Sequence, residues 1–170
     1  MIGVNELAVV DEPYRTPCRA VMLTCVDYRF LRPACDLLER EGLLGSTDLI
    51  AWPGGAMALR SEDAGALLSA LELAVTLHAP PTMLLVAHMD CGRLGGSSRF
   101  GGVKDESAAL EAGLRDVAAV ARSRLPDTRI RLIRLAEGEQ SEVPLPFVPV
   151  GEETIADTAP PFPRTSEDAT

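Results

Sequence analysis

The sequence predicts an α/β domain with a mainly parallel central sheet of about four to five strands flanked by helices. Three observations lead to this prediction. Short apolar runs of the kind found in buried parallel strands recur along the chain. Helical stretches of about ten residues or more separate them, and glycine or proline stands at most boundaries. Strands that alternate with helices in this way form βαβ units, whose helices cover the faces of a parallel sheet.

The first part of the chain contains two predicted strands and one predicted helix. Residues 20–25 (AVMLTC) are almost entirely apolar and predict a buried strand. A helix is expected over residues 31–41, where Pro33 is tolerated in the first turn. Residues 48–52 (DLIAW) predict the second strand, because a Pro-Gly-Gly turn follows at once.

The next helix is predicted to begin at Ser61, a good N-cap, and to continue to Leu77. Its apolar residues run almost all round the helix, so we expect it to be well buried. Residues 83–87 (MLLVA) are the clearest strand of the chain and lead directly to His88. The remaining predicted elements are a Gly- and Ser-rich loop from residue 91, a helix over 105–124 and a half-exposed strand over 129–135.

Length and charge restrict the class of protein. The 170 residues suffice for one α/β domain, which we place at residues 18–150, with an acidic Pro-rich tail at 151–170. The net charge of −9 excludes nucleic acid as an expected partner, because phosphate binding needs clustered Lys and Arg. No apolar run approaches the ~20 residues that span a bilayer, and no secretory signal layout is present. We therefore expect a cytoplasmic protein that does not insert into a membrane.

The residues able to do chemistry follow three of the predicted strands. They lie at 25–29, 52–55 and 88–91. Ligands of open α/β sheets bind outside the carboxyl ends of the strands. We therefore expect these three segments to meet at one edge of the sheet.

Cys25, His88 and Cys91 predict a metal site. Two thiolates and one imidazole are a natural ligand set for Zn²⁺, and three protein ligands leave the fourth tetrahedral position for water or substrate. Four cysteines in a chain without a secretory signal also favour metal binding over disulfides. A Cys–His nucleophile without metal is the alternative, although two cysteines beside one histidine fit zinc better.

Four neighbouring residues are candidates for catalysis or substrate binding. In an extended or gently turning segment Asp27 and Arg29 point the same way, so Arg29 is placed to hold the ionised carboxylate of Asp27 beside the metal. A surface ion pair is the plainer alternative. Gly54 and Gly55 precede a helix and are candidates to offer backbone N–H groups to a bound anion, or they simply form a tight turn. Asp90 fits a hydrogen bond to the site or an ordinary solvated turn equally well.

These motifs together resemble the β-class carbonic anhydrases, whose hallmark is Cys-x-Asp-x-Arg followed by His-x-x-Cys. Here the two motifs read CVDYR at 25–29 and HMDC at 88–91, with Gly54 and Gly55 between them, and the resemblance extends over about residues 20–135. It implies zinc on Cys25, His88 and Cys91, and a zinc-bound hydroxide that attacks carbon dioxide to form bicarbonate.

In such proteins Asp27 would orient the hydroxide and Arg29 would orient Asp27. The resemblance also implies a closed state in which Asp27 takes the fourth zinc position. It further implies a homodimer or higher homo-oligomer, in which an amino-terminal arm, here residues 1–17, wraps around the partner.

Two departures from the family pattern lie beside the metal site. Tyr28 is bulky where the family commonly has a small residue, and Ala51-Trp52-Pro53 stands where Arg-Asn-Ala is common. They leave two alternatives open beside carbon dioxide hydration. One is attack on another small electrophile such as carbon disulfide or carbonyl sulfide. The other is a zinc-binding regulatory protein of the same fold without turnover.

Two further cysteines and the second histidine lie outside the motifs. Cys18 and Cys35 are expected to be ordinary buried or half-buried thiols. His78 ends a predicted helix, where it can interact with the last carbonyl groups. The sequence assigns none of the three a chemical role.

Overall fold

The computed structural model describes residues 17–136 and 139–144. Nearly all of the predicted amino-terminal arm, and the whole predicted tail at 151–170, lie outside these residues. Both therefore stay predictions. Within the described part no helix is long and apolar enough to cross a membrane.

Five strands form one sheet in the order β2-β1-β3-β4-β5. They are β1 (Ala20–Thr24), β2 (Thr47–Ala51), β3 (Thr82–His88), β4 (Arg129–Ala136) and β5 (Glu139–Val143). The first four strands are parallel, and β5 pairs antiparallel with β4. The predicted α/β class and the mainly parallel sheet are therefore confirmed.

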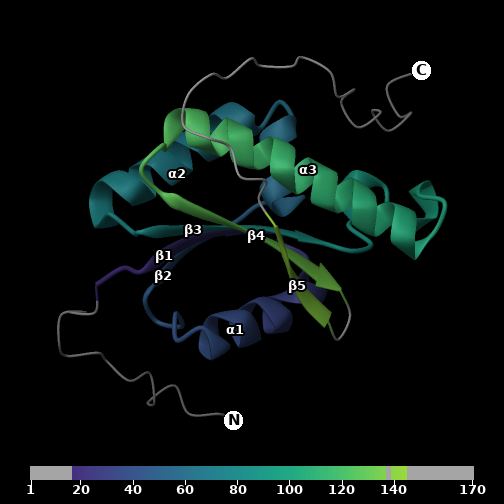
Figure 1. The fold of residues 1–170 in the computed structure, drawn as a ribbon, viewed down its shortest axis with the longest axis horizontal. Helices are drawn as coiled ribbons and strands as arrows, with labels where there is room; N and C mark the ends of the chain where they lie inside the picture. Colours follow the sequence, from purple (N-terminus) through teal and green to yellow (C-terminus); the bar gives the residue numbers. More distant parts are fainter. Residues whose placement is uncertain (1–16, 137–138, 145–170) are drawn as a thin grey trace, which may run out of the picture.

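Helices cover both faces of the sheet. Figure 1 shows α1 (Leu31–Arg40) on one face and α2 (Ala64–His78) with α3 (Val103–Arg124) on the other. Four short 3-10 helices complete the described elements: η2 (Tyr28–Phe30), η3 (Gly55–Arg60), η4 (Gly92–Leu94) and η5 (Ser97–Arg99). The last two lie in the segment predicted as a Gly- and Ser-rich loop.

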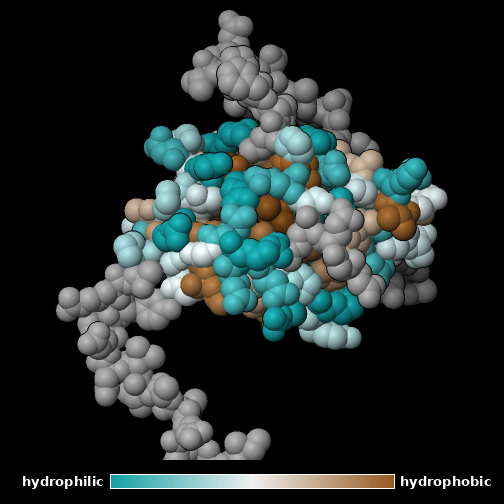
Figure 2. All heavy atoms as spheres, turned by 60° about the horizontal axis from the view of Figure 1, so that its bottom comes forward, coloured by the Kyte–Doolittle hydropathy of each residue, from teal (hydrophilic) through white to brown (hydrophobic). Residues whose placement is uncertain are grey.

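The alternation of side chains along the strands separates two hydrophobic cores. In β1, Val21 and Leu23 join the core under α2 and α3, whereas Ala20 and Met22 join the core under α1. Burial of both faces explains why this strand reads as an uninterrupted apolar run in the sequence. Figure 2 brings the α1 side forward and shows mostly hydrophilic residues over it, with smaller hydrophobic patches between them.

Two predictions about the second helix are wrong. It begins at Ala64 with Asp63 at the N-cap position, two residues later than predicted. The Ser61 hydroxyl still accepts from the Asp63 N–H at 3.2 Å while it donates to the Ala58 carbonyl at 2.7 Å, at the end of the preceding 3-10 helix. The helix is also not buried all round: Leu73 and Leu77 are 58% and 64% exposed. Only one face of α2 packs on the sheet and α3, so the apolar residues on the other face remain at the surface.

Strand β5 has no counterpart among the predicted elements, because its sequence EQSEV lacks a hydrophobic run. It is held by pairing with β4 and by charge. Arg131 of β4 forms ion pairs with Glu142 of β5 and with Glu41 after α1, both at 2.9 Å. These pairs connect the last strand to the α1 side of the sheet.

Candidate metal centre

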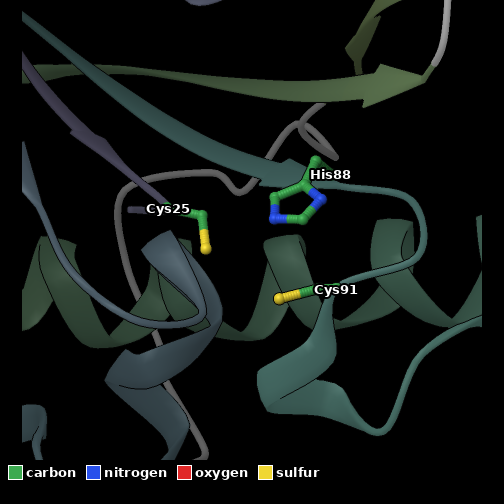
Figure 3. A group of neighbouring side chains, drawn as sticks. All are labelled: Cys25, His88 and Cys91. Atoms are coloured by element: carbon green, nitrogen blue, oxygen red, sulfur yellow. The ribbon is translucent and has the colours of Figure 1, made fainter. Parts of the chain in front are cut away.

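The fold brings Cys25, His88 and Cys91 together. Cys25 directly follows β1, His88 is the last residue of β3, and Cys91 lies in the turn after β3. Since β1 and β3 are adjacent and parallel, their carboxyl ends meet at the same edge. The two sulfur atoms and a ring nitrogen lie within 4.8 Å of one another and point to a common centre (Figure 3). This is the sheet edge that the sequence predicts.

The ring of His88 is oriented by two contacts. Its Nδ1–H donates to the Met89 carbonyl at 2.7 Å, and its ring stacks on Phe30 with centroids 4.1 Å apart. The other nitrogen, Nε2, is buried and has no hydrogen-bond partner among the described residues. A buried nitrogen without a partner costs free energy unless something else binds it. A metal ion held by Nε2 satisfies that atom.

The pKa values of the two thiols, Cys25 and Cys91, are shifted in opposite directions. The pKa of Cys25 is lowered to about 4 by the neighbouring Cys91, against the effect of burial, with His88 and the Gly54 N–H helping. The pKa of Cys91 is raised, because it lies beside the Cys25 thiolate and is buried. Two sulfurs and one imidazole nitrogen are the donors that zinc takes, so the residues present fit a zinc ion.

Asp27 and Arg29 form a hydrogen-bonded pair beside these ligands. Arg29 donates to both carboxylate oxygens of Asp27, from Nη2 to Oδ2 at 2.7 Å and from Nε to Oδ1 at 3.0 Å. Asp27 Oδ2 lies 4.0 Å from Nε2 of His88. The segment is a 3-10 turn capped by Asp27, and this turn brings the two groups together. Arg29 holds the pKa of Asp27 at about 2, so the carboxylate is ionised at neutral pH.

A second acidic residue holds Arg29 from the other side. Arg29 donates to Asp90 Oδ2 at 2.7 Å and to the Asp90 carbonyl at 2.9 Å. Asp90 itself has a left-handed backbone (φ 55°). Its N–H donates to Glu106, a buried carboxylate that also accepts from the Ser97 hydroxyl, both at 2.6 Å. The sequence offers two roles for Asp90, a hydrogen bond to the site or a solvated turn. In the structure Asp90 positions Arg29.

Glu106 and Phe30 are the contributors that the sequence reasoning missed. Glu106 sits in the first turn of α3, where an acidic residue is expected for its helix position alone. Phe30 reads as an ordinary apolar residue before α1. Neither carries a local signal, because each acts through a segment distant in the sequence.

Gly54 and Gly55 form the turn over the site, both with positive φ (89° and 56°). The Gly54 N–H donates to Cys25 Sγ at 3.3 Å, and the Gly55 N–H donates to the Trp52 carbonyl at 2.8 Å. A Cβ on Gly55 would lie 2.7 Å from the Val86 carbonyl oxygen and 2.8 Å from the Cys25 nitrogen. The glycine is therefore needed for the close backbone approach. Anion binding by these two N–H groups stays a prediction.

A pocket of about 540 Å³ opens beside the ligands. Its lining includes the polar and sulfur side chains of Asp27, Arg29, Cys25 and Cys91. Val26, Tyr28, Pro53 and Arg93 line it as well. Tyr28 is 85% exposed and extends from the rim of the pocket. Trp52 instead packs against the core under α2 and α3. Both departures from the family pattern therefore reach the pocket: the first through Tyr28, and the segment Ala51-Trp52-Pro53 through Pro53 alone.

The fold is of the predicted α/β class with a mainly parallel sheet. Comparison with solved structures identifies the fold family within that class. A β-carbonic anhydrase from Trichomonas vaginalis superposes with a TM-score of 0.54 at 14% identity, covering 76% of this chain and 84% of that one. The β-carbonic anhydrase CcaA gives 0.52 at 15% identity over 75% and 79%. CafA of Aspergillus fumigatus gives 0.50 at 13% over 75% of each chain. The chain therefore has the β-carbonic anhydrase fold.

No family model matches the sequence, and no curated protein matches it. At these identities the structural likeness establishes the fold alone. The chemistry has to be argued from the residues of the site.

Proposed function

We propose that this protein is a zinc-dependent carbonic anhydrase that reversibly hydrates carbon dioxide to bicarbonate. One combination of features carries the proposal. The buried Nε2 of His88, which has no hydrogen-bond partner in the described part of the chain, lies with two sulfurs beside an arginine-anchored carboxylate at a pocket. We assign Cys25, His88 and Cys91 as the zinc ligands. Bound there, zinc would act as a Lewis acid that lowers the pKa of water to about 7.

Asp27 is the proposed catalytic carboxylate. Ionised at neutral pH and held by Arg29, it can accept a hydrogen bond from the attacking oxygen and fix the direction of that oxygen's lone pair. Both oxygens of Asp27 are already engaged by Arg29. This engagement favours a carboxylate that stays paired with Arg29 over one that occupies the fourth metal position. Arg29 is the proposed positioning residue, itself held by Asp90.

The walls of the pocket suit the proposed substrate and product. Val26 and Pro53 give an apolar wall for carbon dioxide, while Arg93, which is half-exposed and 3.7 Å from Asp63, gives a positive charge for bicarbonate. Gly54 also lines the pocket, and its N–H faces Cys25 rather than the solvent. We propose Gly54 and Gly55 as residues that shape the substrate position.

The test is the stopped-flow rate of carbon dioxide hydration between about pH 6.5 and 9 on protein of measured zinc content. Asp27→Ala should lower kcat by about 10²-fold or more while zinc content is unchanged, because it removes an acid–base group without touching a ligand. Asp36→Asn is the matched control, since Asp36 also pairs with an arginine (Arg32, 2.6 Å) but lies on α1. A zinc-loaded wild-type protein with no rate above buffer contradicts the proposal.

A second candidate function follows from the rim of the pocket. Pro53 lacks a backbone donor and Tyr28 projects beside it, so the entrance is less polar than Arg-Asn-Ala would make it. An apolar linear electrophile such as carbon disulfide or carbonyl sulfide fits such an entrance. Turnover of these compounds by the zinc-loaded protein, compared with Tyr28→Ala, tests this candidate. No turnover of either compound rejects it.

We also propose a homodimer in the cytoplasm. Leu73 and Leu77 lie one helical turn apart on α2, and Leu49 is exposed on the open edge strand β2. All four cysteines are free, as expected in a reducing compartment. Light scattering should give twice the mass of one chain, and Leu77→Lys should weaken the association. A monomer at micromolar concentration contradicts the homodimer.

A further inference from the structure

We propose a second site for a divalent metal ion of the zinc class, formed by Cys18, Asp48 and His78 at the amino edge of the sheet. The thiol sulfur, a carboxylate oxygen and an imidazole nitrogen of these residues lie within 4.8 Å of one another. Sulfur, nitrogen and oxygen are all donors that zinc accepts. The inference does not rest on the proposed carbonic anhydrase activity.

The topology explains why these three residues meet. Cys18 lies just before β1, and Asp48 is the second residue of β2, so both stand at the amino ends of neighbouring parallel strands. Helix α2 crosses back over the sheet, and its last residue, His78, therefore returns to the same edge. A left-handed Ala79 (φ 46°) then ends the helix before β3 begins.

The ligand atoms are near the separations that a tetrahedral ion needs. In a zinc site neighbouring donor atoms are about 3.3–3.6 Å apart, given bond lengths of about 2.0–2.3 Å. His78 Nδ1 and Asp48 Oδ2 are 2.7 Å apart, so they need to separate by less than an ångström. Their side chains are 51% and 28% exposed, which allows both that movement and entry of the ion. The fourth position would be open to water.

Backbone contacts hold the third ligand in place. The Arg19 N–H donates to the Ser46 carbonyl at 2.7 Å, which fixes the chain around Cys18 against the start of β2. The Cys18 thiol donates to the Ala20 carbonyl at 3.2 Å, and zinc would replace that proton. The carbonyl end of α2 adds a partial negative charge that favours a cation beside His78.

The site is separate from the centre at the carboxyl edge. Cys18 and Cys25 are joined by the extended strand β1, whose rise of ~3.3 Å per residue places them about 20 Å apart. A metal here would link the start of β1, the edge strand β2 and the end of α2. We therefore assign it a stabilising role, with no part in the reaction.

The experiment measures zinc bound per chain after loading with Zn²⁺ and removal of the excess. The wild-type protein should bind about two equivalents, and Cys18→Ser and His78→Gln should each bind one fewer. Cys35→Ser is the matched control and should equal wild type, because Cys35 is also a half-buried free thiol but forms no such cluster with the other residues that the structure describes. Equal zinc content in wild type and His78→Gln overturns the proposal.

A second measurement separates this site from the first. Cys91→Ser removes a ligand at the carboxyl edge and should still bind one equivalent of Zn²⁺. The double variant Cys91→Ser/His78→Gln should bind none. Zn²⁺ should also protect Cys18 from iodoacetamide in wild type and not in His78→Gln, as read by mass spectrometry of the Cys18 peptide. Equal alkylation of Cys18 with and without Zn²⁺ overturns the proposal, whether or not the protein hydrates carbon dioxide.

Discussion

Replacing Gly55 by alanine should destabilise the protein by about 2–5 kcal/mol. The new Cβ would lie 2.7 Å from the Val86 carbonyl oxygen and 2.8 Å from the Cys25 nitrogen. The first is a backbone atom of β3 and the second belongs to the residue directly after β1, so neither can move easily and relieving the overlap costs about 1–3 kcal/mol. The left-handed φ of 56° adds roughly 1–2 kcal/mol for any residue with a Cβ. Because Cys25 is displaced, zinc affinity at the carboxyl edge should fall as well.

Two other glycines provide the controls for this experiment. Gly54→Ala shares the positive φ (89°), but its Cβ would meet the flexible Arg93 side chain at 3.1 Å, so only the strain of about 1–2 kcal/mol is expected. Gly65→Ala, at the second residue of α2 with nothing within 4 Å, should stabilise by at most about 0.5–1 kcal/mol. Urea unfolding followed by circular dichroism measures all three. Equal unfolding free energies for Gly55→Ala and Gly54→Ala would refute the close backbone approach.

Two further predictions concern charged residues. Glu106→Ala should lower the free energy of unfolding by about 2–4 kcal/mol, because it leaves the Asp90 N–H and the Ser97 hydroxyl without their acceptor. Glu106→Gln should lower it less. Urea unfolding that shows no loss for Glu106→Ala contradicts the proposed role of Glu106 as acceptor for these two groups. Arg131 lowers the pKa of Glu41 and of Glu142, so their stabilisation is present above the ordinary glutamate pKa and disappears as the pH falls through the lowered values. Wild type should therefore lose more stability between pH 6 and 3 than Arg131→Gln does, by about 1 kcal/mol because solvent screens both pairs. Parallel pH profiles of the two proteins would show that the ion pairs contribute nothing.

Much of the fold can be predicted from local patterns in this sequence. Strands β1 and β3 are buried on both faces, so their apolar runs carry a strong signal. Helix α3 was expected within two residues of its start because its polar and apolar residues alternate at helical spacing. Strand β5 could not be predicted in this way, because it depends on backbone pairing with β4 and on ion pairs to Arg131.

The same distinction applies to the metal centre. The candidate ligands can be named from residue types and their positions, since zinc chemistry selects cysteine and histidine and the ends of parallel strands meet at one edge. Three features become visible only in the folded protein. The Nε2 of His88 has no hydrogen-bond partner within the described ranges, and Asp90, itself held by Glu106, holds Arg29. His78 also meets Cys18 at the opposite edge of the sheet. The physical reason is that residue types and strand ends are local properties, whereas hydrogen-bond partners and the approach of distant side chains depend on how the helices pack across the sheet.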